Sequence, residues 1–322
     1  MPTYIKNILC LFIIIIVSTS FRNSLGQDNP TYDFLNIDPS SRASALGGAF
    51  ETYTDDPNVV FFNPAGISTV TKKETSACFG KYLLDINFGA VSYAQKYKDL
   101  GWFGAGVKYI NYGTFDYTDE NGVTNGTFSA NDIMVSAGYS NYMYDVINYG
   151  VNIKYIYSTI ASYNSLALAF DFGMLYMVPN QDLNIALSIN NVGQQVYSYA
   201  STRERLPLDV RIGVSKKLEH LPLRLSLSFS NLNNSQIKFL DIQRLKYFSI
   251  GGEFYPSDEV TARIGYNNQE RQDLKTGDYI GIAGFSAGLG IKFFGKYEVD
   301  YSLNSMGKIG STHRFNIGLA FD

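Results

Sequence analysis

From residue 75 to the end of the chain, apolar and polar side chains alternate with a period of two. In residues 183–190 leucine and isoleucine occupy the odd positions, and in 297–303 tyrosine, valine and leucine do the same. Successive side chains of a β-strand point to opposite faces, so each run presents one apolar and one polar face. The pattern predicts an all-β chain.

About fourteen such runs follow one another, and many have roughly eight to fourteen residues, compared with about five to six in an ordinary strand. A strand that crosses an outer membrane at a tilt needs about 9–11 residues. We therefore predict a transmembrane antiparallel β-barrel of about 14 strands over residues 71–322, with its apolar face towards outer-membrane lipid. The expected strands are 75–82, 85–96, 101–113, 127–140, 147–159, 165–178, 182–193, 207–217, 222–232, 246–256, 259–266, 280–292, 296–304 and 312–321.

The lengths of the connections support a membrane barrel independently. Links after even-numbered strands are short, whereas several links after odd-numbered strands are long, at 114–126, 194–206, 233–245 and 267–279. Outer-membrane barrels separate short periplasmic turns from longer extracellular loops in this way. A soluble β-sandwich or propeller is the alternative, but it predicts shorter strands at 8–12-residue spacing or a fixed repeat.

The first residues have the pattern of a secretory signal. Lys6 precedes an apolar run over 8–17, and small residues follow at positions 24 and 26. The run is too short for a membrane helix, which needs about 20 residues. We expect 1–26 to be a signal peptide that is cleaved before Gln27, with an uncleaved anchor as the alternative.

Composition argues against several functional classes. The 26 basic and 29 acidic residues give a net charge of -3, without the basic excess that nucleic-acid binding requires. Only two histidines and two cysteines are present, and the sequence contains no Cys-x-x-Cys or His-Glu-x-x-His motif. His220 in an expected turn and His313 at an expected outer edge leave a catalytic triad without a base. We expect no enzymatic activity, cofactor or metal.

The polar faces of the expected strands carry seven basic and five acidic residues. Because a confined charge needs a partner, this mixture predicts ion pairs across the lumen and a mostly occluded barrel, whereas a lining of one sign would favour an ion-selective pore. The twelve lumen charges are Lys108, Asp132, Lys154, Asp171, Arg211, Arg224, Glu253, Arg263, Lys292, Glu298, Asp300 and Arg314.

Residues 27–70 break the alternation. A fourteen-stranded barrel is wider than its own side chains can fill, so we expect this segment to fold into the lumen as a plug, with a periplasmic tail as the alternative. Pro64 favours an extended Asn63, which suits the approach to the first strand. The plug or gate residues are Arg42, Gly47, Gly48, Asp55, Asp56, Asn63, Pro64 and Ala65.

Three motifs resemble the N-terminal pattern of the PorV/PorQ family, whose members are relatives of FadL-type barrels. They are the small-residue run with Gly47-Gly48, the Asp55-Asp56 pair and Asn63-Pro64-Ala65. Phe34-Leu35-Asn36 and residues 126–139 resemble PorQ more than PorV. The resemblance spans the mature chain, although only the N-terminal motif is moderately specific. It implies a FadL-like outer-membrane barrel of a Gram-negative, Bacteroidota-like cell.

The same resemblance implies a component of the type IX protein secretion system. Such a protein would dock a PorZ-like surface protein of the cargo attachment complex, beside PorU- and PorV-like proteins. The partner surface would be formed by the long loops, where Tyr and Arg are typical anchors. The candidate docking residues are Tyr197, Arg203, Arg205, Lys238, Arg244 and Arg271.

A FadL-like transporter for hydrophobic small molecules is the alternative function. It requires an apolar pocket near the plug and a lateral opening where a strand is kinked. Gly101, Gly104 and Gly106 could supply that kink, or could simply make room for the plug.

Overall fold

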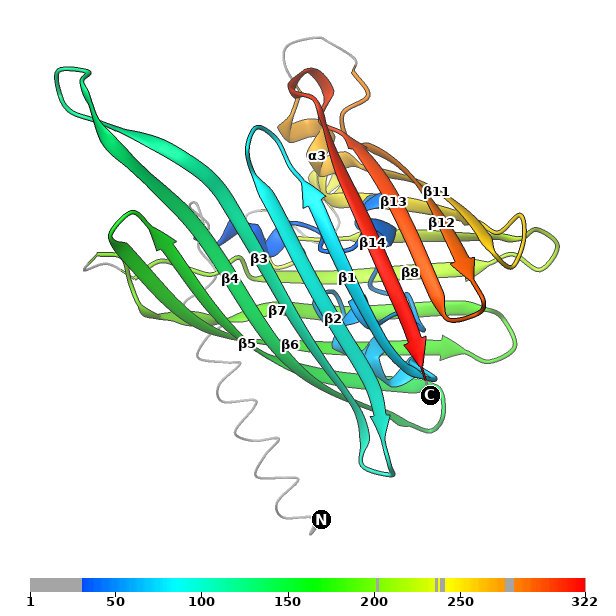
Figure 1. Cartoon of the computed structure of the whole chain (residues 1–322). Coiled ribbons are helices and arrows are strands. Elements are labelled where there is room, and N and C mark those ends of the chain that lie inside the picture. Colours follow the sequence, from blue (N-terminus) through cyan, green and yellow to red (C-terminus); the bar gives the residue numbers. More distant parts are fainter. Residues whose placement is uncertain (1–30, 201–202, 235–236, 238–240, 276–280, 322) are drawn as a thin grey trace.

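Fourteen antiparallel strands close into a barrel in the computed structural model of the protein (Figure 1). The structure describes residues 31–200, 203–234, 237, 241–275 and 281–321, so the expected signal peptide 1–26 lies outside the described residues. Each strand pairs with the next along the chain, and β1 pairs with β14 to close the ring. The predicted all-β barrel is confirmed.

The strands run close to the predicted ranges. They are β1 (Lys73–Lys81), β2 (Asn87–Tyr97), β3 (Gly101–Thr118), β4 (Thr124–Met143), β5 (Ile147–Ile160), β6 (Tyr163–Val178), β7 (Leu183–Tyr197), β8 (Asp209–Lys217), β9 (Leu223–Phe229), β10 (Phe248–Phe254), β11 (Val260–Asn267), β12 (Phe285–Phe293), β13 (Tyr297–Ser305) and β14 (Ser311–Phe321). The short helices are η1 (Asp33–Asn36), α2 (Ser41–Ala45), η2 (Pro57–Phe61), η3 (Pro64–Thr69), η4 (Ile242–Tyr247), α3 (Asn268–Asp273) and η5 (Gly307–Ile309).

The barrel wall is apolar outside and polar inside. In β5, Ile153 and Tyr155 point outward and are 48% and 44% exposed, whereas Asn152 and Lys154 point inward and are 1% and 4% exposed. A water-soluble barrel would place these groups the other way round, so the alternation identifies a transmembrane barrel. Among the described helices, none has the length and apolar character needed to cross a membrane.

One of the expected loops is instead part of the wall. Residues 114–118 and 124–126 extend β3 and β4 into a hairpin that projects beyond the other strands (Figure 1). The ladder continues because Thr114–Asp116 pair with Thr127–Ser129, and the rings of Phe115 and Phe128 stack with centroids 5.3 Å apart. The expectation of a loop over 114–126 was therefore wrong.

The wall has unequal height. Strands β3 to β7 have 14 to 20 residues, whereas β8 to β11 have 7 to 9. The described residues of the long connections after β7, β9 and β11 lie at the same end as the β3–β4 hairpin, as the segregation of loop lengths predicted. We call this end the loop end.

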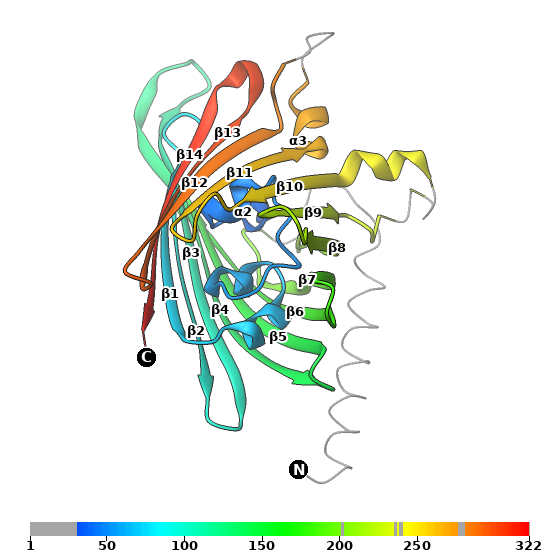
Figure 2. The same cartoon turned by 90° about the vertical axis from the view of Figure 1, so that its right-hand side faces the viewer.

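Residues 31–72, which we call the inner segment, lie inside the barrel (Figure 2). Helix α2 packs against β11 to β14, and η2 and η3 pack against β1 to β6. The centre of the segment is aromatic, because Phe50 stacks on Tyr53 at 4.6 Å and meets the edge of Phe62 at 5.0 Å.

Side-chain caps set the local conformation of the inner segment. Asp56 and Asn63 are the N-cap residues of η2 and η3, and each accepts a hydrogen bond from the backbone N–H two residues later. Asn63 is extended, as predicted, but Pro64 begins η3 rather than leading into the first strand. Strand β1 starts only at Lys73.

Candidate functional site

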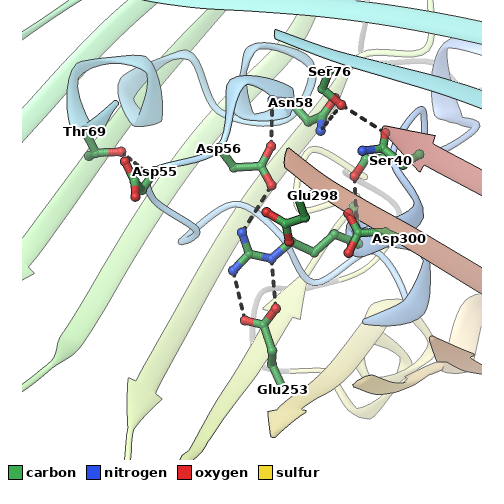
Figure 3. Close-up of polar contacts among 12 residues, drawn as sticks. Ser40, Asp55, Asp56, Asn58, Thr69, Ser76, Glu253, Glu298 and Asp300 are labelled. Atoms are coloured by element: carbon green, nitrogen blue, oxygen red, sulfur yellow. Dashed lines mark hydrogen bonds and ion pairs between the residues drawn. The ribbon is translucent and has the colours of Figure 1, made fainter. Parts of the chain in front are cut away.

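Arg42 joins the inner segment to the barrel wall (Figure 3). Its Nε and Nη2 donate to the two carboxylate oxygens of Glu253 in β10, at 2.8 and 3.0 Å, and its Nη1 lies 3.2 Å from Asp56. All three side chains are largely buried. This fork-shaped contact is the strongest arrangement that an arginine and a carboxylate can form.

Glu253 extends the network around the wall. The Nε of Arg263 in β11 donates to Glu253 at 2.7 Å, and the same guanidinium pairs with Asp300 and Glu298 of β13. Lys292 lies 3.6 Å from Glu298. The charges expected to pair across the lumen thus meet along the wall, between strands that are adjacent or one strand apart.

A second contact holds the inner segment from another direction. Glu51 lies 3.1 Å from Arg211 of β8 and accepts a hydrogen bond from the Ser228 hydroxyl. Arg211 also pairs with Asp209 at 2.5 Å. Glu51 is fully buried, and the sequence analysis missed it, although an isolated acid beside Phe50 in an apolar stretch was the available signal.

Lys154 and Asp171 fix a bulge in β7. Their charged atoms are 2.8 Å apart, and Asp171 also accepts the Asn191 backbone N–H at 2.8 Å. The register between β6 and β7 shifts next to Asp171, and the side chain of Asn191 completes the group by accepting from Lys154 at 2.9 Å. The pair therefore supports an irregular stretch of wall.

Three predicted lumen cations contact the inner segment through neutral groups. Lys108 donates to the backbone carbonyls of residues 34, 35 and 37, at 3.2, 3.0 and 2.7 Å. The Arg224 guanidinium lies 5.5 Å from the centre of the Tyr53 ring, and Arg314 donates to the Asp38 carbonyl at 3.1 Å. Through these contacts the three cations bind the inner segment to the barrel wall.

The predicted plug motifs lie at tight contacts with the wall. Gly47 has a left-handed φ of +66°, and a Cβ there would lie 2.9 Å from the backbone of Tyr266. A Cβ at Gly150 would lie 2.4 Å from Pro64, and the Asn63 amide donates to the Met174 carbonyl at 3.2 Å. Gly48 follows Gly47 with a φ of +81°, and Ala65 is fully buried.

Asp55 ties the middle of the inner segment to its end, just before β1. Its backbone N–H donates to the Thr69 hydroxyl at 2.9 Å (Figure 3), and its carboxylate accepts from Thr71 at 3.2 Å. The two neighbouring aspartates thus make different contacts: Asp55 binds Thr71, and Asp56 binds Arg42. Asp56 is buried, whereas Asp55 is exposed.

Gly104 and Gly106 of β3 make room for the inner segment. A Cβ at Gly104 would lie 2.9 Å from Ile67, and one at Gly106 would lie 2.5 Å from Phe61. The β2–β3 ladder keeps one register throughout, and Gly101 stands only at its start. For Gly104 and Gly106 the structure thus supports the alternative that they make room for the plug, whereas a Cβ at Gly101 would meet Tyr139 and Ser140 of β4.

The candidate docking residues fall into different settings. Tyr197, Arg203 and Arg205 are exposed at the loop end, Arg271 lies half-buried on α3, and Lys238 lies outside the described residues. Arg244 is buried and donates to the carbonyls of residues 231, 234 and 237 at 2.7, 2.8 and 2.6 Å. It holds its own loop together, so its guanidinium is not presented to a partner.

A cavity of about 530 Å³ opens at the loop end, beside the β3–β4 hairpin. Its volume is in the range of small-molecule sites. We call it the mouth pocket, and its lining residues are Thr31, Tyr32, Asp33, Tyr112, Phe115, Phe128, Ala130, Asp132, Ser158, Ile160, Tyr199 and Glu204. Beneath it lies an apolar layer that includes Ile110, Met134 and Ile156, all buried.

Hydroxyl groups organise one side of the mouth pocket. Tyr112 donates to Asp132 at 2.6 Å, Ser158 donates to the other Asp132 oxygen, and Tyr199 donates to Ser158. Burial is the main cause that raises the pKa of Tyr199 to about 12, so its ring carries a neutral hydroxyl at physiological pH. The sequence analysis named Asp132 as a lumen charge but did not predict this pocket.

No family model and no curated protein matches the sequence. The fold is similar to that of the Ralstonia pickettii toluene transporter TbuX, with a TM-score of 0.58 and 12% identity over 89% of this chain and 100% of that chain. The P. putida toluene transporter TodX is also similar, with a TM-score of 0.60 and 10% identity over 88% of this chain and 98% of that chain.

A Pseudomonas aeruginosa FadL homologue gives a TM-score of 0.54 at 11% identity, covering 88% of this chain and 98% of that chain. At such identities the likeness concerns the fold. The chain has the fold of these FadL-like outer-membrane β-barrels, and these neighbours are described as transporters or as a FadL homologue.

Proposed function

We propose that the protein lies in an outer membrane and takes up small hydrophobic molecules through the mouth pocket. The observation that carries the proposal is a ligand-sized cavity lined by aromatic rings at the loop end of the barrel. The toluene transporters with a similar fold support it. The apolar outer faces of the strands would contact the lipid.

The inner segment links the mouth pocket to the lumen. Thr31 and Tyr32 line the pocket, and the same stretch of chain continues into α2, η2 and η3 inside the barrel. A ligand in the pocket therefore touches the segment that lies across its path. Uptake then requires the inner segment to shift relative to the wall, and the contacts of Arg42 and Glu51 limit that movement.

Filling the pocket tests the proposal. Ala130 lines the pocket, whereas Ala137 on the same strand is exposed on the outer face. We expect purified protein to bind the fluorescent apolar probe N-phenyl-1-naphthylamine saturably, the Ala130→Trp variant to lose this binding, and Ala137→Trp to retain it. Equal binding by both variants, or none by the wild type, would refute uptake through this pocket.

A second candidate function is the docking of a surface protein in the type IX secretion system. It is favoured by apolar side chains that are exposed at the loop end, with Ile242, Leu245 and Ile282 being 79%, 50% and 68% exposed. Such side chains are typical of a protein interface. The partner would be a PorZ-like protein beside PorU- and PorV-like proteins of a Bacteroidota-like cell, as the resemblance of the N-terminal motif implies.

Removal of the gene separates the two functions. Uptake predicts slower growth on a hydrophobic carbon source with normal maturation of surface cargo. Docking predicts the opposite: unaffected growth on that source and cargo that fails to mature at the cell surface.

A further inference from the structure

The mouth pocket combines aromatic rings with carboxylates. Phe115, Phe128 and Tyr112 come from the wall, Tyr32 from the inner segment and Tyr199 from the β7–β8 connection. Of the described residues that line the pocket, three are acidic, namely Asp33, Asp132 and Glu204, and none is basic. Tyrosine and phenylalanine faces attract cations, and so do carboxylates.

The carboxylate of Asp132 is held in place without being neutralised. Its two hydrogen-bond donors, Tyr112 and Ser158, are both neutral hydroxyls. The residue is 6% exposed, and the cavity lies in front of it. A buried carboxylate that lacks a protein cation attracts a positive charge from a ligand more strongly than an exposed carboxylate does, because water screens it less.

The nearest cations along the same strands are occupied deeper in the lumen. Lys108 and Lys154 lie on β3 and β5, below the apolar layer that contains Ile110 and Ile156. Lys108 donates to three backbone carbonyls and Lys154 pairs with Asp171. Near the rim, Arg203 and Arg205 flank Glu204 along the chain, but they are exposed and do not line the cavity.

The tyrosines report the same negative environment. Burial is the first cause that raises the pKa of Tyr32, and the negative charges of Glu204 and Asp132 add to it. The pKa of Tyr199 rises for the same reasons, with burial again first. These negative charges would repel a ligand that carries a carboxylate and would attract a cation.

We propose that the ligand of the mouth pocket is a small organic cation with an apolar body, such as an aromatic or alkyl ammonium compound, rather than a fatty acid or a neutral hydrocarbon. The inference rests on the proposed uptake function and names its ligand class. The apolar body would lie against Phe115, Phe128 and the apolar layer beneath. The ammonium group would lie between Asp132 and the tyrosine rings.

Three ligands of similar size test the charge preference by displacement of N-phenyl-1-naphthylamine from the purified full-length barrel. Benzyltrimethylammonium and neopentylbenzene have the same shape and differ in charge, and 3-phenylpropionate supplies the anion. We expect the cation to displace the probe at a concentration roughly tenfold or more below that of the neutral compound, with the anion weakest. Added salt should weaken the binding of the cation and leave the binding of the neutral compound unchanged.

Two variants localise the effect. Asp132→Asn keeps a hydrogen-bonding side chain but removes the charge, and Asp33→Asn removes an exposed charge at the other side of the pocket. We expect each to lower the affinity for benzyltrimethylammonium, by about tenfold for Asp132→Asn, without changing that for neopentylbenzene. Glu120→Gln, which removes an exposed acid at the tip of the hairpin, is the matched control and should change neither.

The outcomes distinguish the ligand class from the function. Equal or tighter binding of neopentylbenzene or 3-phenylpropionate would overturn the cation proposal, while uptake through the pocket would stand. Unchanged cation binding in both aspartate variants would also overturn it. A wild-type barrel that binds neither the probe nor any of the three ligands would overturn the proposed function itself.

Discussion

Arg42 of the inner segment and Glu253 of β10 form a two-pronged ion pair, with N–O distances of 2.8 and 3.0 Å, inside the closed wall. Loss of one member of a buried pair leaves an uncompensated charge, whereas replacement of both by apolar residues is far less costly. The stability of the barrel should therefore depend on this pair as a unit.

We expect Arg42→Ala to lower the free energy of unfolding by roughly 3–5 kcal/mol, because Glu253 then retains only Arg263 and the Tyr255 hydroxyl as strong partners. The double variant Arg42→Met/Glu253→Met should recover much of the loss. Urea unfolding in detergent, followed by the gel shift of folded barrels, measures both. Lys246→Ala, which breaks an exposed pair with Asp273, is the control and should cost less than about 1 kcal/mol.

Gly150→Ala should displace the inner segment, because the new Cβ would lie 2.4 Å from the carbonyl group of Pro64. We expect a loss of roughly 1–3 kcal/mol and a leakier lumen, seen as larger currents in planar bilayers than the low conductance expected of the wild type. At Gly89 the nearest atom to an added Cβ is 3.7 Å away, so Gly89→Ala should leave both measurements unchanged. A stable, large wild-type current would contradict an occluded barrel.

The α3 helix should loosen as pH rises. Burial, helped by Asp38 and Asp273 and opposed by Arg314, raises the pKa of Glu270 from 4.5 to about 7. A folded state that holds this proton more tightly than the unfolded state loses stability as pH increases from 4.5 to about 7. Hydrogen exchange of the α3 amides, corrected for intrinsic rates, should show decreasing protection over that window, and Glu270→Gln should remove the trend.

Charges placed on the exposed apolar residues of η4 test the docking function. Ile242→Asp/Leu245→Asp should release a surface partner from the outer membrane while the barrel still assembles, because a desolvated charge opposes association. Leu221→Asp, which changes an exposed leucine in the β8–β9 turn at the opposite end, is the control. Pull-down from solubilised membranes measures retention, and unaltered retention in the η4 variant argues against docking there.

The strands could be predicted from sequence because lipid on one side of the wall and a polar lumen on the other constrain the polarity of every residue. A side chain of the wall faces either lipid or the polar lumen, so period two persists along the whole strand, and the range 147–159 predicted for β5 differs from Ile147–Ile160 by one residue. The projecting hairpin escaped prediction because the β3 register shifts between Asn111 and Thr114. That shift turns Phe115 towards the mouth pocket.

The candidate site was less accessible to sequence reasoning. Tyr32 and Tyr199 are far apart along the chain, and only the position of the inner segment inside the closed barrel brings both to the mouth pocket. Arg244 was misjudged for a related reason, since no periodic pattern describes the loop whose carbonyls it binds. The motif of paired glycines and Asn63-Pro64-Ala65 was recognisable because close backbone contacts restrict those positions to particular residue types.

The position of the inner segment also constrains the order of assembly. Helix α2 rests on the last four strands and η2 on the first three, so the segment bridges both sides of the seam between β1 and β14. Entry into an already closed cylinder would require the buried Arg42 and Glu51 to pass through one open end and to reach their partners along the interior. We therefore expect the inner segment to be in place before β1 and β14 pair, so that it holds the first and last strands close to each other while the barrel closes.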